Sequence, residues 1–208
     1  MYEVGVIDYG IGNIKSISNI LDKVGASSII ITKPSEMECC KSLILPGVGS
    51  FDAAIECLEL GGWVEPLNKF AKIDCKPLLG ICLGMQLLTK SSQEGKRRGL
   101  GFINAETVSF KKEKMNKRAK VPHMSWNLVN VVKQNKIFTP LIESRFYFVH
   151  SYHVVCNDKK DVLTTTNYGY EFVSSFCRDN IIGVQFHPEK SHNFGYSFFI
   201  KFIKDFIV

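Results

Sequence analysis

Apolar runs typical of buried strands alternate with helical patterns through the first half of the chain. This alternation constrains the fold more than any other feature of the sequence. The apolar runs lie at Val4–Ile7, Ile29–Ile31, Leu43–Leu45 and Leu78–Ile81. Helical spacing of apolar residues begins near Ile14, Phe51 and Leu83. Parallel strands need such crossover helices, so the pattern predicts an α/β fold of three layers, with a mostly parallel central sheet and helices on both faces.

The second half of the chain has a different pattern. Short β segments are expected at Thr107–Phe110, Asn127–Val132, Phe146–Val149, Val162–Thr166 and Ile181–Phe186. They predict antiparallel strands added to the parallel core. The last segment, Asn193–Val208, has phenylalanines at helical spacing, which indicates a helix that packs on the sheet. No linker or repeat interrupts the sequence, so we expect one domain over residues 1–208.

The composition excludes several classes of protein. With 208 residues, 45% hydrophobic and 22% charged, the chain fits a globular domain. The longest uncharged stretch, between Lys76 and Lys90, is too short to span a bilayer, and the N-terminus shows no signal-peptide pattern. The seven cysteines form no C-x-x-C pair, which disfavours a disulfide framework and a zinc site. We therefore expect a cytosolic (cytoplasmic) protein that binds no metal.

The net charge of +6 is concentrated in residues 96–120, which we interpret as one basic, hairpin-like insert. Its basic residues are Lys96, Arg97, Arg98, Lys111, Lys112, Lys114, Lys117, Arg118 and Lys120. The basic residues are not interleaved with aromatic ones, so a nucleic-acid-binding module is disfavoured. A solvated surface loop and a site for an anionic substrate or acidic partner are the two interpretations.

A strand-to-helix junction carries the strongest chemical signal. Residues Gly80–Gly84 (GICLG) have the G-x-nucleophile-x-G spacing of a nucleophile elbow, with Cys82 at the centre. The sharp turn of an elbow strains the nucleophile, and a glycine two residues away on each side avoids steric clashes. The Cys82 sulfur would lie at a helix N-terminus, which favours the thiolate, and the Leu83 amide could stabilise an oxyanion. An inert core cysteine is the alternative.

A thiolate nucleophile needs a base, and the base needs an orienting group. Among the five histidines, only His187 has a sharply defined setting, at the end of an apolar strand and before Pro188. Residues two apart on an extended chain point to the same side, so Glu189 can accept a hydrogen bond from one ring nitrogen of His187. The pattern predicts a Cys82–His187–Glu189 triad, although an isolated H-x-E pattern is more often a surface pair.

Several motifs resemble those of the class I (triad) glutamine amidotransferases. The two that carry the triad are Gly80–Leu88 (GICLGMQLL) and Gln185–Ser191 (QFHPEKS). Four others are similar to the glutaminase subunits of imidazole glycerol phosphate synthase: Asp8–Asn13 (DYGIGN), Leu45–Phe51 (LPGVGSF), Val121–Asn127 (VPHMSWN) and Tyr147–Tyr152 (YFVHSY). The resemblance extends from Val4 to about Ser191. It implies the flavodoxin-like fold of these glutaminases.

The resemblance also implies an activity. Cys82 would attack the side-chain amide of L-glutamine, and water would then hydrolyse the glutamyl thioester to glutamate. His187 would act as general base and acid, and Glu189 would orient it. The ammonia would pass to a (β/α)8 barrel synthase subunit, the partner in a heterodimer. That partner would make imidazole glycerol phosphate and aminoimidazole carboxamide ribotide in histidine biosynthesis. No cofactor is implied.

The same resemblance assigns residues around the substrate. Glutamine would contact Gly49, Gln86, Glu94, Ser151 and Tyr152. The alternatives are a helix-surface amide for Gln86 and a solvated loop acid for Glu94. A second oxyanion donor is expected from the loop after the third strand, at Val48. Gly47 allows the Gly47–Val48 peptide to turn its amide toward or away from the oxyanion.

The partner would contact Asn13, Trp126, Tyr147 and Lys190, which match family positions at the synthase interface. Core packing is the alternative for Trp126. The family stretch Pro-His-Met-Gly-Trp-Asn has Ser125 in place of glycine here. This serine indicates either a tolerant backbone angle or a paralogous subunit that supplies ammonia to a surface-sugar synthase. A non-catalytic scaffold would be expected to lack the triad, and a cysteine peptidase would need an extended cleft.

Overall fold

The computed structural model describes residues 1–115, 120–138 and 143–207. The strands are β1 (Tyr2–Ile7), β2 (Ser28–Ile31), β3 (Cys40–Leu45), β4 (Leu78–Ile81), β5 (Ala105–Ser109), β6 (His123–Val131), β7 (Ser144–His150), β8 (Tyr152–Cys156), β9 (Val162–Tyr168), β10 (Tyr170–Arg178) and β11 (Ile181–Val184). The α-helices are α1 (Ile14–Lys23), α2 (Phe51–Leu60), α3 (Val64–Asn68), α4 (Leu83–Leu87) and α5 (His192–Phe206). Shorter helical turns cover Pro34–Cys39, Lys69–Ile73, Lys112–Lys114, Lys159–Asp161 and Pro188–Lys190.

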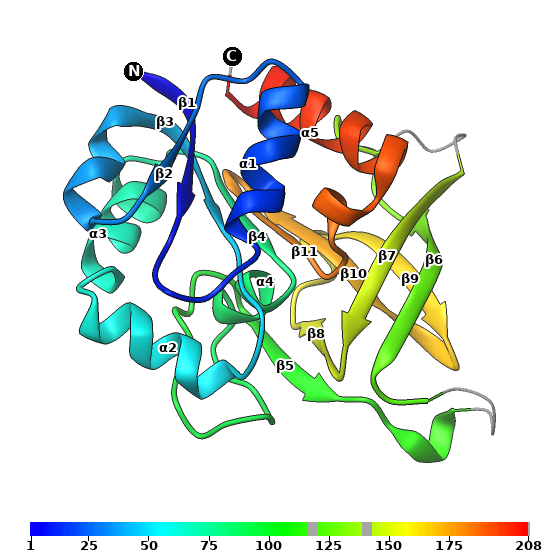
Figure 1. Cartoon of the computed structure of the whole chain (residues 1–208). Helices are drawn as coiled ribbons and strands as arrows, with labels where there is room; N and C mark the ends of the chain where they lie inside the picture. Colours follow the sequence, from blue (N-terminus) through cyan, green and yellow to red (C-terminus); the bar gives the residue numbers. More distant parts are fainter. Residues whose placement is uncertain (116–119, 139–142, 208) are drawn as a thin grey trace.

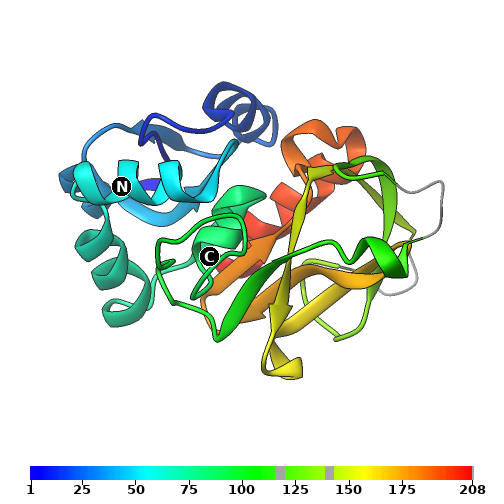
Figure 2. The ribbon, with the colours of Figure 1, turned by 90° about the horizontal axis from the view of Figure 1, so that it is seen from below.

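The central sheet follows the order β2-β1-β3-β4-β11-β10-β9-β6-β7. Neighbours from β2 to β11 are parallel, and those from β11 to β7 are antiparallel. β8 pairs with both β10 and β5 off this path. The core strands β3, β4 and β11 are buried on both faces, which explains their continuous apolar sequence. Seen from below, the antiparallel strands lie on the far side of the molecule from α2 and α3 (Figure 2).

Helices cover both faces of the parallel strands. Helices α1 and α5 lie near each other and share one apolar core, to which they contribute Leu21 and Phe199 (Figure 1). Helices α2 and α3 contribute Leu58 and Leu67 to a second core. The expected three-layer α/β fold with a mostly parallel core and added antiparallel strands is therefore confirmed.

Three features of the fold differ from the sequence prediction. The segment expected as an antiparallel addition at Ile181–Phe186 contains β11, which completes the parallel core beside β4. Strands β8 and β10 were not predicted, because buried polar residues such as His153 and Ser174 interrupt their apolar pattern. Helix α3 was also not predicted.

Three parallel strands end together at one edge of the sheet. Leu45 of β3 pairs with Gly80 of β4, and Val184 of β11 pairs with Ile81 of β4. The loops that follow β3, β4 and β11 therefore leave the sheet side by side. In open α/β sheets, ligands bind outside the carboxyl ends of such strands.

Candidate active site

Cys82 occupies a strained turn between β4 and α4. Its backbone angles are φ 55° and ψ −110°, a region that costs energy for any residue with a Cβ. The backbone holds this turn, because the Cys82 amide donates to the Val184 carbonyl at 2.8 Å. A Cβ at Gly80 would lie 2.7 Å from the Gly84 carbonyl oxygen, and one at Gly84 would overlap the Leu45 carbonyl. Both glycines of the elbow are sterically required, as the sequence predicted.

His187 and Glu189 form a buried pair beside this elbow. His187 Nδ1 lies 2.8 Å from Glu189 Oε1, and the two side chains are 2% and 1% exposed. The other ring nitrogen, Nε2, has no hydrogen-bond partner among the described residues. Burial lowers the pKa of His187, but the Cys82 sulfur and the Glu189 carboxylate outweigh it and raise this pKa to about 10. The raised pKa favours an imidazolium beside the sulfur.

Cys82 and His187 line one pocket of about 260 Å³. The other lining residues are Val48, Gly49, Leu83, Gln86, Glu94, Pro122, Val149, His150, Ser151, Tyr152 and Lys190. The pocket therefore gathers all five residues that the resemblance assigned to glutamine binding. The size is adequate for a small amino acid, and the walls mix carboxylate, amide and backbone groups.

The loop after β3 packs directly on the elbow. Gly47 is buried behind the pocket, where a Cβ would lie 2.8 Å from the Gly84 nitrogen. The Tyr9 hydroxyl donates to the Pro46 carbonyl at 2.9 Å and anchors the start of the loop. Val48 is 41% exposed and lines the pocket. As the first residue of α4, Leu83 has an amide without an acceptor inside the helix, so this donor is available to a bound oxyanion.

Gln86 is buried inside the protein rather than exposed on the surface of α4. Its Nε2 donates to the Tyr152 carbonyl at 3.1 Å and to Gln185 Oε1 at 3.0 Å. Gln185 Nε2 in turn lies 3.8 Å from the Cys82 sulfur, within reach of a weak hydrogen bond to sulfur. The alternative of a helix-surface amide for Gln86 is therefore wrong.

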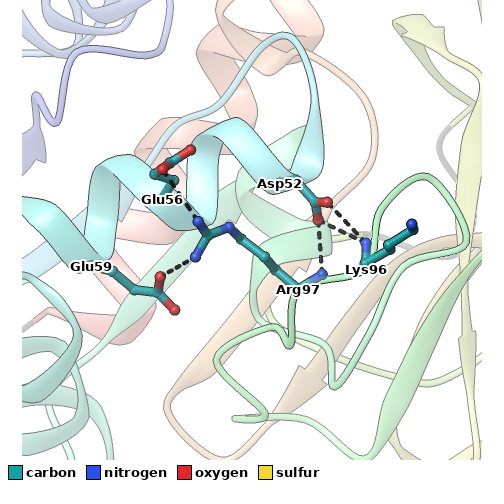
Figure 3. Close-up of polar contacts among 5 residues, drawn as sticks. All are labelled: Asp52, Glu56, Glu59, Lys96 and Arg97. Atoms are coloured by element: carbon teal, nitrogen blue, oxygen red, sulfur yellow. Dashed lines mark hydrogen bonds and ion pairs between the residues drawn. The ribbon is translucent and has the colours of Figure 1, made fainter.

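Glu94 is held at the pocket by helix α2. Its Oε2 accepts a hydrogen bond from the Phe51 amide at 2.9 Å, at the first turn of that helix. Burial raises the pKa of Glu94. Asp52, the next residue of α2, accepts from the backbone amides of Lys96 and Arg97 (Figure 3). These amides hold the pKa of Asp52 below its usual value. The loop that carries Glu94 is thus held to α2 at two points, by Glu94 itself and by the amides of Lys96 and Arg97. Glu94 is therefore not a freely solvated acid.

The described part of residues 96–120 does not form the expected hairpin. Strand β5, within this range, pairs with β8 instead of with another part of the stretch. Arg97 extends its guanidinium to Glu59 at 2.6 Å and to Glu56 at 3.2 Å, both on α2 (Figure 3). Two carboxylates of α2 therefore neutralise part of the basic charge. The sequence did not indicate this pairing, because α2 is distant from Arg97 along the chain. Lys117 and Arg118 lie outside the described residues.

The four expected partner-contact residues differ in exposure. Trp126 on β6 is 41% exposed, so core packing is excluded, and its ring lies parallel to that of His192 with the centroids 5.5 Å apart. Tyr147 is half-buried on β7, directly opposite Trp126. Lys190 is exposed and lines the pocket. Asn13 is half-buried and precedes α1, which packs against the turn that contains Lys190.

The apolar face of β6 continues beyond Trp126. Met124 and Leu128, two residues to either side, are 59% and 38% exposed. Together these three side chains form an exposed apolar stripe, here named the β6 stripe, on a strand that lies between β9 and the edge strand β7. In the antiparallel register Met124 lies opposite Val149, which lines the pocket. The β6 stripe and the candidate active site are therefore neighbours in the sheet.

Sequence reasoning missed several residues of the site. Gln185 was part of a recognised motif but had no assigned role. His150 lines the pocket and bonds to a second buried histidine, His123. Asp52 looked like an ordinary first-turn helix acid. The alternation of His123, Ser125 and Asn127 could have indicated a polar face of β6. It could not identify His150 as their partner, because His150 is distant in sequence.

Comparisons with known proteins agree with this geometry. Residues 5–205 match the family described as glutamine amidotransferase class-I. The chain is 53% identical to the imidazole glycerol phosphate synthase subunit HisH 2 of Methanococcus maripaludis, covering 97% of this chain and 98% of the relative. It is 46% identical to the HisH 2 subunit of Pseudomonas aeruginosa, covering 96% and 98%.

A solved structure supports the fold independently. The structure of PurLQS from Thermotoga maritima matches with a TM-score of 0.77 at 17% identity, covering 98% of this chain and 99% of that one. No helix in the described part of the chain is long and apolar enough to cross a membrane. With the family matching nearly the whole length, and a strained cysteine beside a buried histidine–glutamate pair, this chain belongs to the class I glutamine amidotransferase family.

Proposed function

We propose that this chain is the glutaminase subunit of an imidazole glycerol phosphate synthase and supplies ammonia in histidine biosynthesis. The observation that carries the proposal is the pocket in which Cys82 and His187 meet the five expected glutamine contacts. Relatives at 53% and 46% identity are named as HisH subunits of that synthase, which supports the choice of acceptor pathway.

The chemistry proceeds in two steps. The Cys82 sulfur attacks the side-chain amide carbon of glutamine, and the amide of Leu83 stabilises the resulting oxyanion. His187 donates its Nε2 proton to the leaving nitrogen, so ammonia departs and a glutamyl thioester forms. His187 then takes a proton from water, which attacks the thioester and releases glutamate. Glu189 holds the imidazole through Nδ1 and stabilises its charged form.

The ammonia acceptor is a (β/α)8 barrel subunit that docks on the β6 stripe. An exposed Trp flanked by Met and Leu on one strand is unusual for a solvated surface and fits a protein interface. Val149 connects this face to the pocket, which keeps the path for ammonia short. We also propose a single domain and a cytosolic location; the absence of disulfides among the seven cysteines supports the latter.

Ser125 has a local explanation that does not require a different acceptor. Its hydroxyl lies 3.1 Å from His123 Nε2, so the serine satisfies a buried ring nitrogen. Reconstitution with purified barrel subunits distinguishes a histidine-pathway subunit from a paralogue that supplies ammonia to a surface-sugar synthase.

The test is reconstitution with purified barrel subunits. The chain is mixed with the histidine-pathway barrel subunit of the same organism, and glutamine-dependent formation of imidazole glycerol phosphate is measured. The expected result is a stable one-to-one complex with glutamine-dependent turnover. Complex formation only with a barrel protein from a surface-sugar pathway would overturn the acceptor assignment, whereas absence of glutamate production in any complex would overturn the glutaminase assignment.

A further inference from the structure

The Cys82 sulfur has a buried polar neighbour that the two-step mechanism does not use. Gln185 is fully buried, and its Nε2 lies 3.8 Å from the sulfur. Because this amide nitrogen points to Cys82, the amide oxygen faces Gln86, from which it accepts at 3.0 Å. The second hydrogen of the Gln86 amide goes to the Tyr152 carbonyl at 3.1 Å. Both glutamine amides therefore have fixed orientations.

The Tyr152 carbonyl also fixes the protonation of two histidines. His150 Nδ1 lies 2.7 Å from this carbonyl oxygen, which can only accept, so Nδ1 carries the proton. His150 Nε2 is then an acceptor for His123 Nδ1 at 3.0 Å. His123 Nε2 is left as an acceptor, and it receives Asn127 Nδ2 at 3.1 Å and the Ser125 hydroxyl at 3.1 Å. One consistent set of donors and acceptors therefore extends from Asn127 to Cys82.

The surroundings keep both imidazoles neutral and immobile. The His123 ring is sandwiched between Phe148 and Tyr168, at centroid distances of 4.9 and 3.9 Å. His150 packs against Phe110 and Phe172. Burial lowers the pKa of His123 to about 4 and holds that of His150 well below its usual value. Fully satisfied polar networks of this kind rigidify the site that they reach.

We propose that this hydrogen-bonded chain, Asn127/Ser125–His123–His150–Tyr152 carbonyl–Gln86–Gln185, positions the Cys82 sulfur and stabilises its thiolate. The members of the hydrogen-bonded chain are positioning residues, since Gln185 alone among them touches the nucleophile, whose sulfur also lies 3.8 Å from the Val149 carbonyl oxygen. The proposal rests on Cys82 being the nucleophile of the proposed function.

The outer end of the chain lies beneath the β6 stripe. His123, Ser125 and Asn127 occupy the inward face of β6, and Met124, Trp126 and Leu128 occupy the outward face. Successive side chains of one strand point to opposite faces of the sheet. A partner that binds the β6 stripe therefore acts on the same strand that carries the end of the chain.

The direction of the chain is tested by the histidine tautomers. Nitrogen-15 chemical shifts of the isolated full-length chain at pH 7 should show the Nδ1–H form for both His123 and His150. Asn127→Asp replaces the outer donor by an acceptor and should bring a proton to His123 Nε2. Asn130→Asp, the same change at an exposed position of β6, should leave both spectra unchanged. An Nε2–H tautomer at His150 in the unaltered protein would overturn the proposal.

The effect on the nucleophile is tested by alkylation with iodoacetamide, followed by mass spectrometry of the Cys82 peptide. Gln185→Met removes the donor to sulfur and should slow Cys82 alkylation about tenfold, the usual effect of a lost hydrogen bond to a charged group. His150→Gln loses the donor to the Tyr152 carbonyl and should also slow Cys82 alkylation. His150→Asn places an amide donor near the Nδ1 position and should react several-fold faster than His150→Gln.

The exposed Cys39 and Cys75 provide internal references, because their alkylation should not change in any variant. Equal rates of Cys82 alkylation in His150→Gln, Gln185→Met and the unaltered protein would overturn the proposed role of the hydrogen-bonded chain. These measurements need neither glutamine nor the partner. A Cys82 that reacts no faster than Cys39 in the unaltered protein would instead contradict the nucleophile assignment, so the two failures are distinguishable.

Discussion

The backbone amide of His187 donates a hydrogen bond to the carbonyl oxygen of Tyr147 at 2.9 Å. Tyr147 lies beside Trp126 of the β6 stripe, and its own backbone amide donates a hydrogen bond to the Ser191 hydroxyl at 3.1 Å. That hydroxyl donates back to the His187 carbonyl at 2.6 Å. The candidate base is therefore attached on both sides of its backbone to a strand that faces the proposed partner.

Replacing Cys82 should separate the two half-reactions. Cys82→Ala is expected to abolish glutamine-dependent synthesis by the complex, because no other described group in the pocket can form the thioester. Synthesis from ammonium salt should persist, since the proposed function places the acceptor chemistry on the partner. Turnover with each nitrogen source is the measurement, and loss of both activities in an assembled complex would contradict this division.

Changes in the buried pair should have unequal effects. His187→Asn is expected to lower glutaminase kcat nearly as much as loss of Cys82, because members of a triad act as a unit. Glu189→Gln should be milder, since a neutral amide can still orient the Nδ1 side of the ring. The rate of Cys82 alkylation against pH reports the role of His187. An unchanged profile in His187→Asn would show that another group serves as the base.

The isolated chain should be a poor glutaminase that its partner activates. The Gly47–Val48 peptide can turn its amide toward or away from the oxyanion, and a missing donor typically costs about 10²–10³ in rate. The hydrogen bond between the Tyr147 carbonyl and the His187 amide offers one route from the proposed docking surface, the β6 stripe, to the site. Glutamate production is compared for the chain alone, the complex, and the complex with an acceptor analogue. Equal turnover in all three would indicate an oxyanion hole that is permanently formed.

Asp52 should affect glutamine binding without touching glutamine. Asp52→Asn replaces an acceptor of the Lys96 and Arg97 amides with a group that can donate, so the loop that carries Glu94 should loosen (Figure 3). We expect a several-fold higher KM for glutamine with little change in kcat. Glu59→Gln is the matched control, because its surface ion pair with Arg97 contributes little. A fall in kcat alone in Asp52→Asn would contradict this role.

The buried His153 should make stability depend on pH. Burial lowers its folded-state pKa to about 4, below the unfolded value of 6.5, so the unfolded chain binds more protons between these values. The stability that the neutral ring contributes is present above pH 6.5 and is lost as the pH falls below it. From pH 7 to pH 5 this loss is about 2 kcal/mol for one such histidine. Urea unfolding at both pH values should show a correspondingly smaller loss in His153→Gln, and an equal loss would contradict the assignment.

Local sequence was sufficient for the parallel core and the nucleophile. Strand β4 begins and ends where the apolar pattern predicted, because buried parallel strands need continuous apolar residues, and helix α2 begins at Phe51 as predicted. Gly80 and Gly84 identified the elbow because their spacing around Cys82 is local. The turn itself excludes a Cβ at Gly80, whereas the Leu45 carbonyl of β3 excludes one at Gly84. The contact between His187 and Glu189 was also predicted from local spacing, although Pro188–Lys190 forms a helical turn and not the extended chain that the prediction assumed.

Contacts between distant segments were decided only by the tertiary structure. Strand β10 was not predicted, because serines such as Ser174 and Ser175 are typical of loops. In the fold both are buried, and their hydroxyls lie 2.8 and 2.6 Å from the Thr164 hydroxyl of β9. The pairing of Arg97 with α2, and of Gln185 with Gln86, joins residues that no periodicity relates. A hydrogen bond can stabilise a buried polar group only when the fold brings its partner within about 3 Å, and sequence spacing does not carry that distance.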